Sequence, residues 1–310
     1  MTPLIQTELF GMNKYFNEII SLYNKEKLPN KILLSGIKGI GKSTLAYHII
    51  NYILSQNEDN KYDINNFKIN YENKSFKLLR NNSHPNFHLI DLLKEKKNIE
   101  INQIREMINY HNKSSFSDMP KFILIDNVEN LNKNSTNALL KILEEPNENT
   151  FFILVYDNSK NILSTLKSRC LTFKINLSFN EIEKITNLFF NKDIRSLINK
   201  ELTFKYNSQG NIIRLINFAN EKKIDLLKYS LKDFLFLLIE NSYYKKNKFI
   251  KDLVISYIEL YFFNLVKNAK NKELIFKSYN YFIEKINNTN KFNLDEESLF
   301  MEFKSKVLNG

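Results

Sequence analysis

The sequence predicts an α/β protein in which helices cover a parallel sheet, followed by a second half that is entirely helical. In the first half, short and continuously apolar segments alternate with helix-like segments, as is typical of parallel strands buried on both faces. From about residue 178 onward no strand-like segment appears, and apolar residues recur at helical spacing. Only 6 glycines and 5 prolines occur in 310 residues, which favours long helices over a turn-rich β-sandwich.

Each expected element is a short apolar or periodic run. Strands are expected over residues 31–35, 86–92, 121–126, 150–156 and 171–175. Helices are expected between them over residues 42–54, 101–111 and 135–145. The polar, asparagine-rich segment 57–83 is expected to be an insertion with partial helix. In the second half, helical spacing is found over residues 180–191, 211–222, 234–238, 250–265 and 274–286.

These elements suggest three domains: an α/β domain over residues 1–176, a small helical domain over 177–222 and a helical C-terminal domain over 223–310. The single cysteine, Cys170, excludes a disulfide framework and a cysteine-based zinc site, so no zinc is expected. The N-terminus lacks the pattern of a signal peptide, and no apolar run is long enough to span a bilayer. We therefore expect a soluble, cytoplasmic protein without membrane contacts.

The net charge of +11 leaves two interpretations open. A basic protein can bind nucleic acid through phosphate contacts, which would make the chain a direct DNA-binding module. A lysine- and asparagine-rich composition produces the same charge on an ordinary solvated surface. Charge alone does not decide between them.

A phosphate-binding loop is predicted after the first expected strand. Residues 36–43 read GIKGIGKS and match the pattern G-x-x-x-x-G-K-[ST], with an apolar strand before the loop and a helix after it. In such a loop backbone N–H groups surround phosphate oxygens, the lysine reaches the β- and γ-phosphates, and the hydroxyl ligates Mg²⁺. The alternative is a chance match on a glycine-containing turn. The residues expected to bind ATP or ADP are Gly36, Gly39, Gly41, Lys42, Ser43 and Thr44.

An acidic residue is expected to complete this site. Asp126 ends the apolar segment over residues 122–125, where P-loop NTPases place a carboxylate that holds Mg²⁺. Ser43 and Asp126 are therefore the expected magnesium residues. An ordinary strand-end acid is the alternative.

Several motifs in the first half resemble those of bacterial sliding-clamp loader subunits, which are members of the AAA+ family. Residues 137–146 read NALLKILEEP, and residues 168–170 read SRC. Upstream, residues 84–86 (HPN) and 99–107 (IEINQIREM) are similar to further elements of the same family. These motifs and the P-loop occur in the family's order over roughly residues 25–175. The resemblance implies an AAA+ P-loop domain, a helical lid and an all-α collar domain that assembles with other subunits.

Within that family the chain is most similar to delta-prime-like subunits of DNA polymerase III. Motor subunits follow the magnesium acid with a glutamate that orients the attacking water, whereas Asn127 stands here and cannot accept a proton. General-base catalysis contributes roughly 10²–10⁴-fold, so hydrolysis by the chain alone is expected to be slow. Glu129 could substitute only if the loop bends. The γ-phosphate-sensing position falls near Tyr156, which also suggests weak hydrolysis.

The resemblance also implies a role for Arg169 in the SRC motif. In the family this arginine projects into the ATP site of the next subunit as an arginine finger, so a subunit that hydrolyses poorly can still serve a neighbour. The alternative is a surface or helix-capping arginine. The implied partners are the gamma/tau motor and delta subunits and the sliding clamp, with primed DNA contacted mainly as part of the complex.

Two questions remain open at the level of sequence. Arg214, at the start of the helix expected over residues 211–222, resembles a second nucleotide-sensing position, and an ordinary exposed helix arginine is the alternative. The intact P-loop leaves open an autonomous, motor-type AAA+ ATPase, which robust hydrolysis by the isolated chain would reveal.

Overall fold

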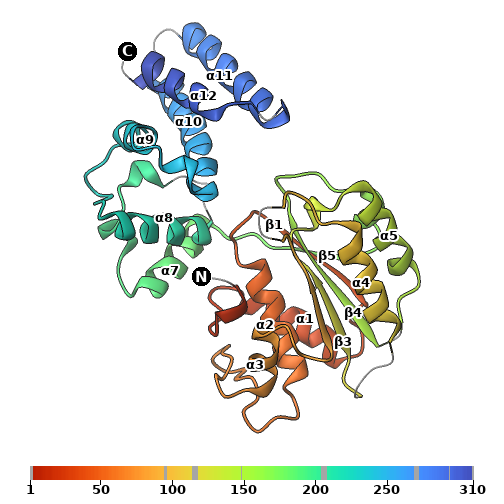
Figure 1. Ribbon diagram of the computed structural model, residues 1–310. Helices are drawn as coiled ribbons and strands as arrows, with labels where there is room; N and C mark the ends of the chain where they lie inside the picture. Colours follow the sequence, from red (N-terminus) through yellow and green to blue (C-terminus); the bar gives the residue numbers. More distant parts are fainter. Residues whose placement is uncertain are drawn as a thin grey trace. The chain divides into compact units, whose positions relative to one another are not determined.

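The computed structural model describes residues 3–93, 96–113, 118–147, 149–203, 208–268, 272–292 and 294–308. The chain divides into two compact units (Figure 1). Unit 1 comprises Met1–Thr186 together with Ser208–Asn211, and unit 2 comprises Asn187–Asn207 and Ile212–Gly310. The finer division into three domains at residues 176 and 222 remains a prediction.

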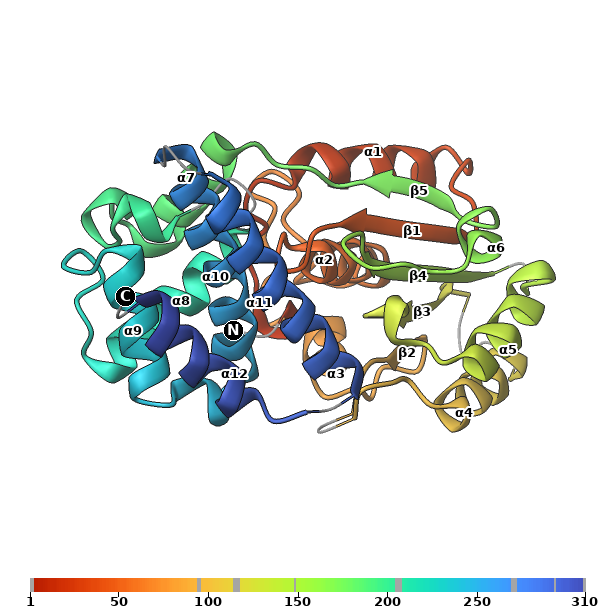
Figure 2. The same ribbon diagram turned by 90° about the horizontal axis from the view of Figure 1, so that it is seen from above.

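Unit 1 contains the predicted parallel sheet. The described strands form one five-stranded sheet in the order β2-β3-β4-β1-β5 (Figure 2). Every neighbouring pair is parallel, so each connection crosses the sheet. The strands are β1 (Lys31–Gly36), β2 (Phe87–Ile90), β3 (Lys121–Ile125), β4 (Thr150–Asp157) and β5 (Leu171–Lys174). All five predicted strands are confirmed within two residues at each end.

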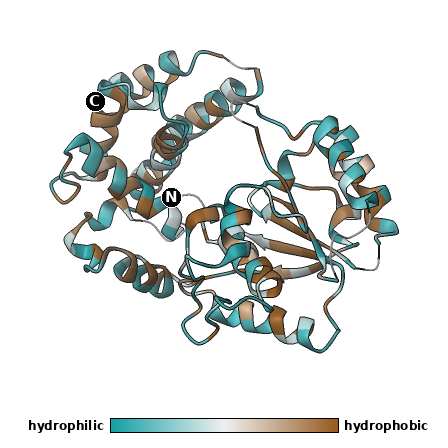
Figure 3. Ribbon diagram, turned by 60° about the horizontal axis from the view of Figure 1, so that its bottom comes forward, coloured by the Kyte–Doolittle hydropathy of each residue, from teal (hydrophilic) through white to brown (hydrophobic). Residues whose placement is uncertain are grey.

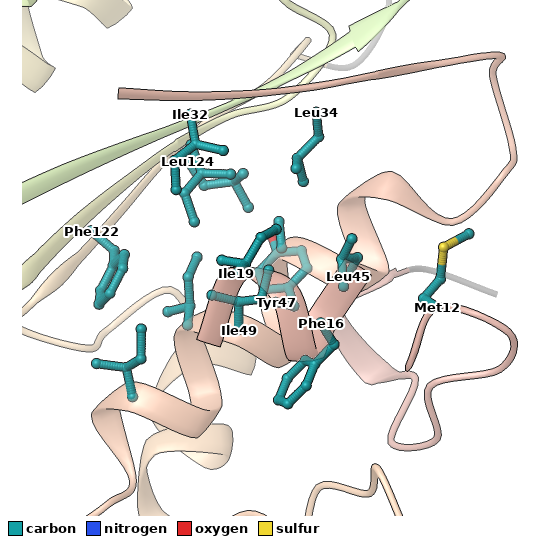
Figure 4. Close-up of a cluster of buried hydrophobic side chains, with 14 of the residues drawn as sticks. Met12, Phe16, Ile19, Ile32, Leu34, Leu45, Tyr47, Ile49, Phe122 and Leu124 are labelled. Carbon is teal, nitrogen blue, oxygen red and sulfur yellow. The ribbon is translucent and has the colours of Figure 1, made fainter. Parts of the chain in front are cut away.

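Helices cover both faces of this sheet, because alternate strand residues point to opposite sides. On β1, Leu34 packs against α1 (Asn13–Asn24) and α2 (Lys42–Leu54), whereas Leu33 faces α4 (Ile101–Asn112) and α5 (Lys133–Glu144). The strands are mostly hydrophobic, whereas the helices mix both kinds of residue (Figure 3). Figure 4 shows the first of these cores, in which side chains of α1 and α2 point toward those of β1 and β3.

The N-terminal helix α1 was not predicted, although it carries a helical pattern. Phe16, Ile19 and Ile20 are buried at spacings of three and four residues. They form the apolar stripe by which α1 packs on the sheet. The short helix α6 (Ser164–Lys167), which precedes Arg169, was also not predicted.

The predicted insertion over residues 57–83 is folded against α2. It contains the short helix α3 (Lys74–Arg80), as expected for partial helix. The Asn73 side chain caps α3 and accepts a hydrogen bond from Asn51 Nδ2 of α2 at 3.0 Å. Glu58 accepts hydrogen bonds from the backbone N–H groups of Lys74 and Ser75. Polar side chains therefore fix this segment to the rest of unit 1.

All elements that the structure describes in unit 2 are helical. The helices of the second half are α7 (Phe179–Phe190), α8 (Gln209–Lys222), α9 (Leu231–Glu240), α10 (Lys248–Asn268), α11 (Lys272–Phe292) and α12 (Glu296–Phe303). Unit 2 takes most of α8 and all of α9–α12. Within the described ranges, no helix is long and apolar enough to cross a membrane.

Candidate nucleotide site and exposed arginine

The predicted nucleotide site lies at the carboxyl edge of the sheet. The P-loop follows β1, Asp126 follows β3, and Asp157 ends β4, which lies between these two strands. Gly36 and Asp157 are partners in the β1–β4 register. Ligands of open α/β sheets bind at this edge, because the ends of parallel strands meet there. Three segments distant in sequence thus converge where the motif predicts phosphate binding.

The path of the P-loop requires glycine at two positions. Gly39 has a φ of +81° and Gly41 a φ of +100°, both in the left-handed region. Residues with a Cβ are strained there, whereas glycine is not. Gly41 is the N-cap of α2, so the loop leads directly into the N-terminus of that helix. Backbone N–H groups at a helix N-terminus favour an anion, and this geometry fits phosphate.

Lys42 is held against its own loop. Its Nζ donates hydrogen bonds to Gly36 O at 2.7 Å and to Ile37 O at 2.8 Å, and only 5% of the residue is exposed. Burial lowers the pKa of this ammonium, while the charges of Asp157 and Asp126 oppose the shift. The nearby carboxylates therefore help to keep the lysine charged for an anionic ligand.

The two predicted magnesium residues contact each other. Ser43 Oγ donates a hydrogen bond to Asp126 Oδ2 at 2.6 Å. Burial raises the pKa of Asp126 to about 6, against the effect of the Ser43 hydrogen bond and with a further contribution from the charge of Asp91. A hydroxyl and a carboxylate are hard oxygen ligands of the kind Mg²⁺ uses together with phosphates. Thr44 follows in the first turn of α2 and is half-buried.

Asn127 is fixed by a residue that the sequence did not single out. It adopts a left-handed conformation with φ +56°, and its backbone N–H donates to Asp126 Oδ1 at 2.8 Å. Its side-chain Nδ2 donates to Asp91 Oδ1 at 2.7 Å, just after β2. The position next to the magnesium acid is thus occupied by an amide engaged with a carboxylate.

The γ-phosphate-sensing position was predicted near Tyr156, at the end of β4, and this remains a prediction. Tyr156 packs in the hydrophobic cluster on the α4–α5 face, and Lys167 Nζ lies 4.9 Å from its ring centroid. The next residue, Asp157, is the one whose charge acts on Lys42. Strand alternation explains the difference, since consecutive residues point to opposite faces. Glu129 lies in the turn that follows β3 and Asn127. Its side chain is only 2% exposed and accepts a hydrogen bond from Asp157 N at 3.1 Å.

The first turn of α8 is docked on the P-loop. Gln209 Nε2 donates to Ile40 O at 2.5 Å, and Gly210 N donates to Gly39 O at 3.0 Å. A Cβ at Gly210 would lie 2.6 Å from Gly39 O, so the close approach needs glycine. Sequence reasoning missed these contacts, because the two segments are separated by about 170 residues along the chain.

Arg214 lies one turn further along α8, in unit 2. It is exposed, and its guanidinium carbon lies 5.9 Å from the centroid of the Phe249 ring of α10. Contact between Arg214 and a nucleotide remains a prediction.

No group of three or more histidine, cysteine or acidic residues that could hold a metal occurs among the described residues.

Arg169 is partly exposed between α6 and β5. Its Nη1 donates to Thr165 O at 2.9 Å, and its Nη2 lies 2.5 Å from Glu144 Oε1. One third of the side chain is exposed to solvent.

The neighbouring Cys170 is half-buried, and burial raises the pKa of its thiol to about 11. A protonated, partly buried thiol fits a packing residue and not a nucleophile.

A five-stranded parallel sheet with this strand order, a P-loop after β1 and an acid after β3 define a member of the AAA+ class. The family model described as "DNA polymerase III, delta subunit" matches residues 11–178. The chain is also 32% identical over 289 residues to a DNA polymerase III subunit delta' from Buchnera aphidicola subsp. Schizaphis graminum, covering 89% of this chain and 84% of the relative. The chain belongs to the DNA polymerase III delta' family, and is a clamp-loader subunit.

Other relatives agree with this assignment. The delta' subunit from Escherichia coli K12 is 24% identical over 155 residues, covering 50% of this chain and 45% of the relative. A DNA polymerase III subunit gamma from the same Buchnera is 33% identical over 171 residues, covering 55% of this chain and 44% of the relative. A gamma subunit-related protein from Thermotoga maritima has the same fold, with a TM-score of 0.52 at 16% identity, covering 93% of this chain and 97% of that one.

Proposed function

We propose that this clamp-loader subunit binds a magnesium nucleotide, hydrolyses it poorly, and supplies Arg169 to the ATP site of a neighbouring motor subunit. The observation that carries the proposal is the combination of a well-formed P-loop with an amide in place of the catalytic glutamate. Lys42, Ser43 and Asp126 are brought together, whereas Asn127 is tied to Asp91.

Binding of ATP or ADP is supported by the geometry of the loop. The glycines at 39 and 41 adopt the conformations that turn the backbone into the N-terminus of α2. Lys42 would pair with the β- and γ-phosphates, and Ser43 with Asp126 would hold Mg²⁺. Bound Mg²⁺ would neutralise charge on the phosphates. Arg214 is proposed as a further nucleotide contact.

Weak hydrolysis follows from the chemistry of Asn127. An amide can orient a water molecule but cannot take its proton, and loss of a general base costs about 10²–10⁴-fold. The Asn127 amide is also already engaged with Asp91, at 2.7 Å. Glu129, the nearest alternative, is buried and accepts the backbone N–H of Asp157. Neither residue is placed to act as a ready base.

The in-trans role of Arg169 rests on its exposure and its family motif. A guanidinium that is one-third exposed can reach an acceptor outside the chain. An arginine finger stabilises charge on the transferring phosphoryl group and contributes about 10³–10⁵-fold. The proposed partners are the gamma/tau motor and delta subunits and the sliding clamp. The chain is proposed to contact primed DNA mainly as part of the assembled complex, in the cytoplasm.

A motor-type ATPase is the second candidate, because the P-loop is complete and a gamma subunit is similar over 171 residues. The test is the clamp- and DNA-stimulated ATPase rate of the reconstituted complex with the native chain, with Arg169→Ala and with Arg105→Ala. Arg105 is a matched control, since it is an exposed arginine on α4 of the same unit.

The proposed function requires a loss of about 10³-fold with Arg169→Ala, no change with Arg105→Ala, and negligible hydrolysis by the chain alone. An unchanged rate with Arg169→Ala would exclude the in-trans role. Efficient ATPase by the isolated chain would instead establish the motor-type alternative.

A further inference from the structure

The guanidinium of Arg169 is held from one side by two acceptors of its own chain. Nη2 pairs with Glu144 Oε1 at 2.5 Å, and Nη1 donates to Thr165 O at 2.9 Å. Glu144 is the last residue of α5, and Thr165 belongs to α6. The arginine is thus fixed to two helices rather than extended freely into solvent.

These two bonds leave most of the donor capacity of the side chain unused. A guanidinium carries five N–H groups in a rigid fork. Two of them serve Thr165 and Glu144, and the described residues provide no other partner for this group. Three donors therefore remain for an acceptor from outside the chain, such as a phosphate oxygen.

The position of Glu144 is unfavourable for the helix that carries it. The C-terminus of a helix bears partial negative charge, so an acidic residue there is destabilising and a basic one stabilising. Glu144 and Glu145 both stand at the end of α5. The cation of Arg169 offsets this repulsion for Glu144, which links the acid at the end of α5 to the arginine after α6.

We propose that Glu144 is a positioning residue that orients the Arg169 fork for the phosphoryl group in the neighbouring subunit. The inference rests on the proposed in-trans role of Arg169. Both side chains of the pair are substantially exposed, at 33% and 54%, so the pair contributes little to the stability of the fold. The ion pair instead limits the rotamers of the Arg169 side chain before ATP binds in the neighbouring subunit.

The experiment compares ATP turnover by the reconstituted complex carrying Glu144→Ala, Arg169→Ala or both changes. Glu145→Ala is the matched control, because Glu145 is the adjacent acid at the same helix end and is also exposed. Glu144→Ala is expected to lower kcat about three- to fivefold, the effect of losing an exposed ion pair, with KM for ATP unchanged. Glu145→Ala is expected to leave both constants unchanged.

The double variant separates positioning from a structural role. If Glu144 acts only through Arg169, adding Glu144→Ala to Arg169→Ala gives no further loss, because the interaction is already absent. A further loss in the double variant overturns the proposal, as does an unchanged or higher rate with Glu144→Ala alone. An unaltered rate with Arg169→Ala instead removes the proposed function itself, so the two failures are distinguishable.

Discussion

Asn127 shows how a single residue is fitted to its surroundings at the nucleotide site. Its left-handed backbone suits asparagine, which tolerates that region better than most residues. Its amide donates to Asp91 Oδ1 at 2.7 Å, an interaction that a carboxylate at the same position could not make. Restoring the glutamate of motor subunits at this position would therefore place two negative groups together.

We expect Asn127→Glu alone to leave ATPase activity of the isolated chain near background. The new carboxylate would be repelled by Asp91 and would lose the hydrogen bond that now fixes the side chain. The double change Asn127→Glu with Asp91→Asn restores a donor–acceptor pair and is expected to raise the rate above that of either single variant. Steady-state turnover with saturating Mg-ATP measures this, and a high rate from Asn127→Glu alone would contradict the argument.

His48 is a buried histidine whose hydrogen bonds define its tautomer. Nε2 lies 3.0 Å from Gln6 O, a carbonyl that can only accept, so Nε2 carries the proton. Nδ1 then accepts the hydrogen bond of Tyr62 OH at 2.8 Å. Burial lowers the pKa of His48 to about 4, in part opposed by the Gln6 carbonyl. The folded chain holds this imidazole neutral at pH 7.

This shift makes the free energy of unfolding depend on pH. Between about pH 4 and pH 6.5 the unfolded chain binds a proton at His48 that the folded chain does not. The contribution of His48 to the free energy of unfolding is therefore fully present above pH 6.5 and is lost as the pH falls through 4, by at most roughly 3–4 kcal/mol. His48→Gln is expected to flatten the pH dependence in this window.

Urea unfolding at several pH values between 4 and 7 measures this slope. His88→Gln is the control, since His88 is only partly buried. A slope that stays the same in the His48 variant would show that His48 does not control it.

At the level of residues, the sequence predicted the groups that a motif defines and missed those that only contacts define. Lys42, Ser43 and Asp126 were identified because their spacing and strand context are fixed by phosphate and Mg²⁺ chemistry. Asp91 and Gln209 were not, because each acquires its role from a partner remote in sequence. The sequence also did not show that Tyr156 and Asp157 point to opposite faces at the end of β4, because that depends on the register of the strand.

Among the elements, the first turn of α8 has a special relation to the P-loop. Gly210 is the second residue of this helix. In the middle of a helix, alanine ordinarily stabilises by about 0.5–1 kcal/mol relative to glycine. Here the added Cβ would lie 2.6 Å from the backbone oxygen of Gly39, which cannot move without displacing the loop. The usual sign of a glycine-to-alanine change in a helix is therefore reversed.

We expect Gly210→Ala to destabilise unit 1 by about 1–3 kcal/mol and to weaken ADP binding, since overpacking must shift either α8 or the P-loop. Asn220→Ala, at an exposed position of the same helix, is the control and is expected to be neutral or slightly stabilising. Thermal unfolding with and without Mg-ADP measures both effects. A Gly210→Ala chain at least as stable as the native one would disprove the close approach.

Elements were predictable where local pattern and burial agree. The five strands are continuous apolar runs, and the helix predicted over residues 42–54 matches α2 at both ends. For α5, the expected start at residue 135 was two residues late, because the helix begins beyond the Asn132 side-chain cap. The folding of segment 57–83 depends on hydrogen bonds between its polar side chains and α2, which hydrophobic periodicity does not reveal.

On the scale of the whole molecule, the two units have separate cores. Unit 1 is organised around the sheet, whereas unit 2 contains a cluster of packed aromatic rings. Phe262, Phe282 and Phe303 lie within 6.1 Å of one another by ring centroids. Aromatic pairs of this kind stabilise beyond their buried area and compensate for a core without tryptophan. Two such cores make a single two-state transition unexpected for this chain.

We expect calorimetry to resolve two transitions that respond to different changes. Phe262→Ala removes a ring that is 2% exposed. It is expected to lower the free energy of unfolding of unit 2 by roughly 3–5 kcal/mol and so to lower the temperature of its transition. Mg-ADP, bound at the P-loop, would raise the transition temperature of unit 1, because it binds the folded state alone. Phe263→Ala is the control, because the neighbouring ring is 56% exposed. If both treatments shift one common transition, the units unfold together and the nucleotide site is energetically coupled to the aromatic core.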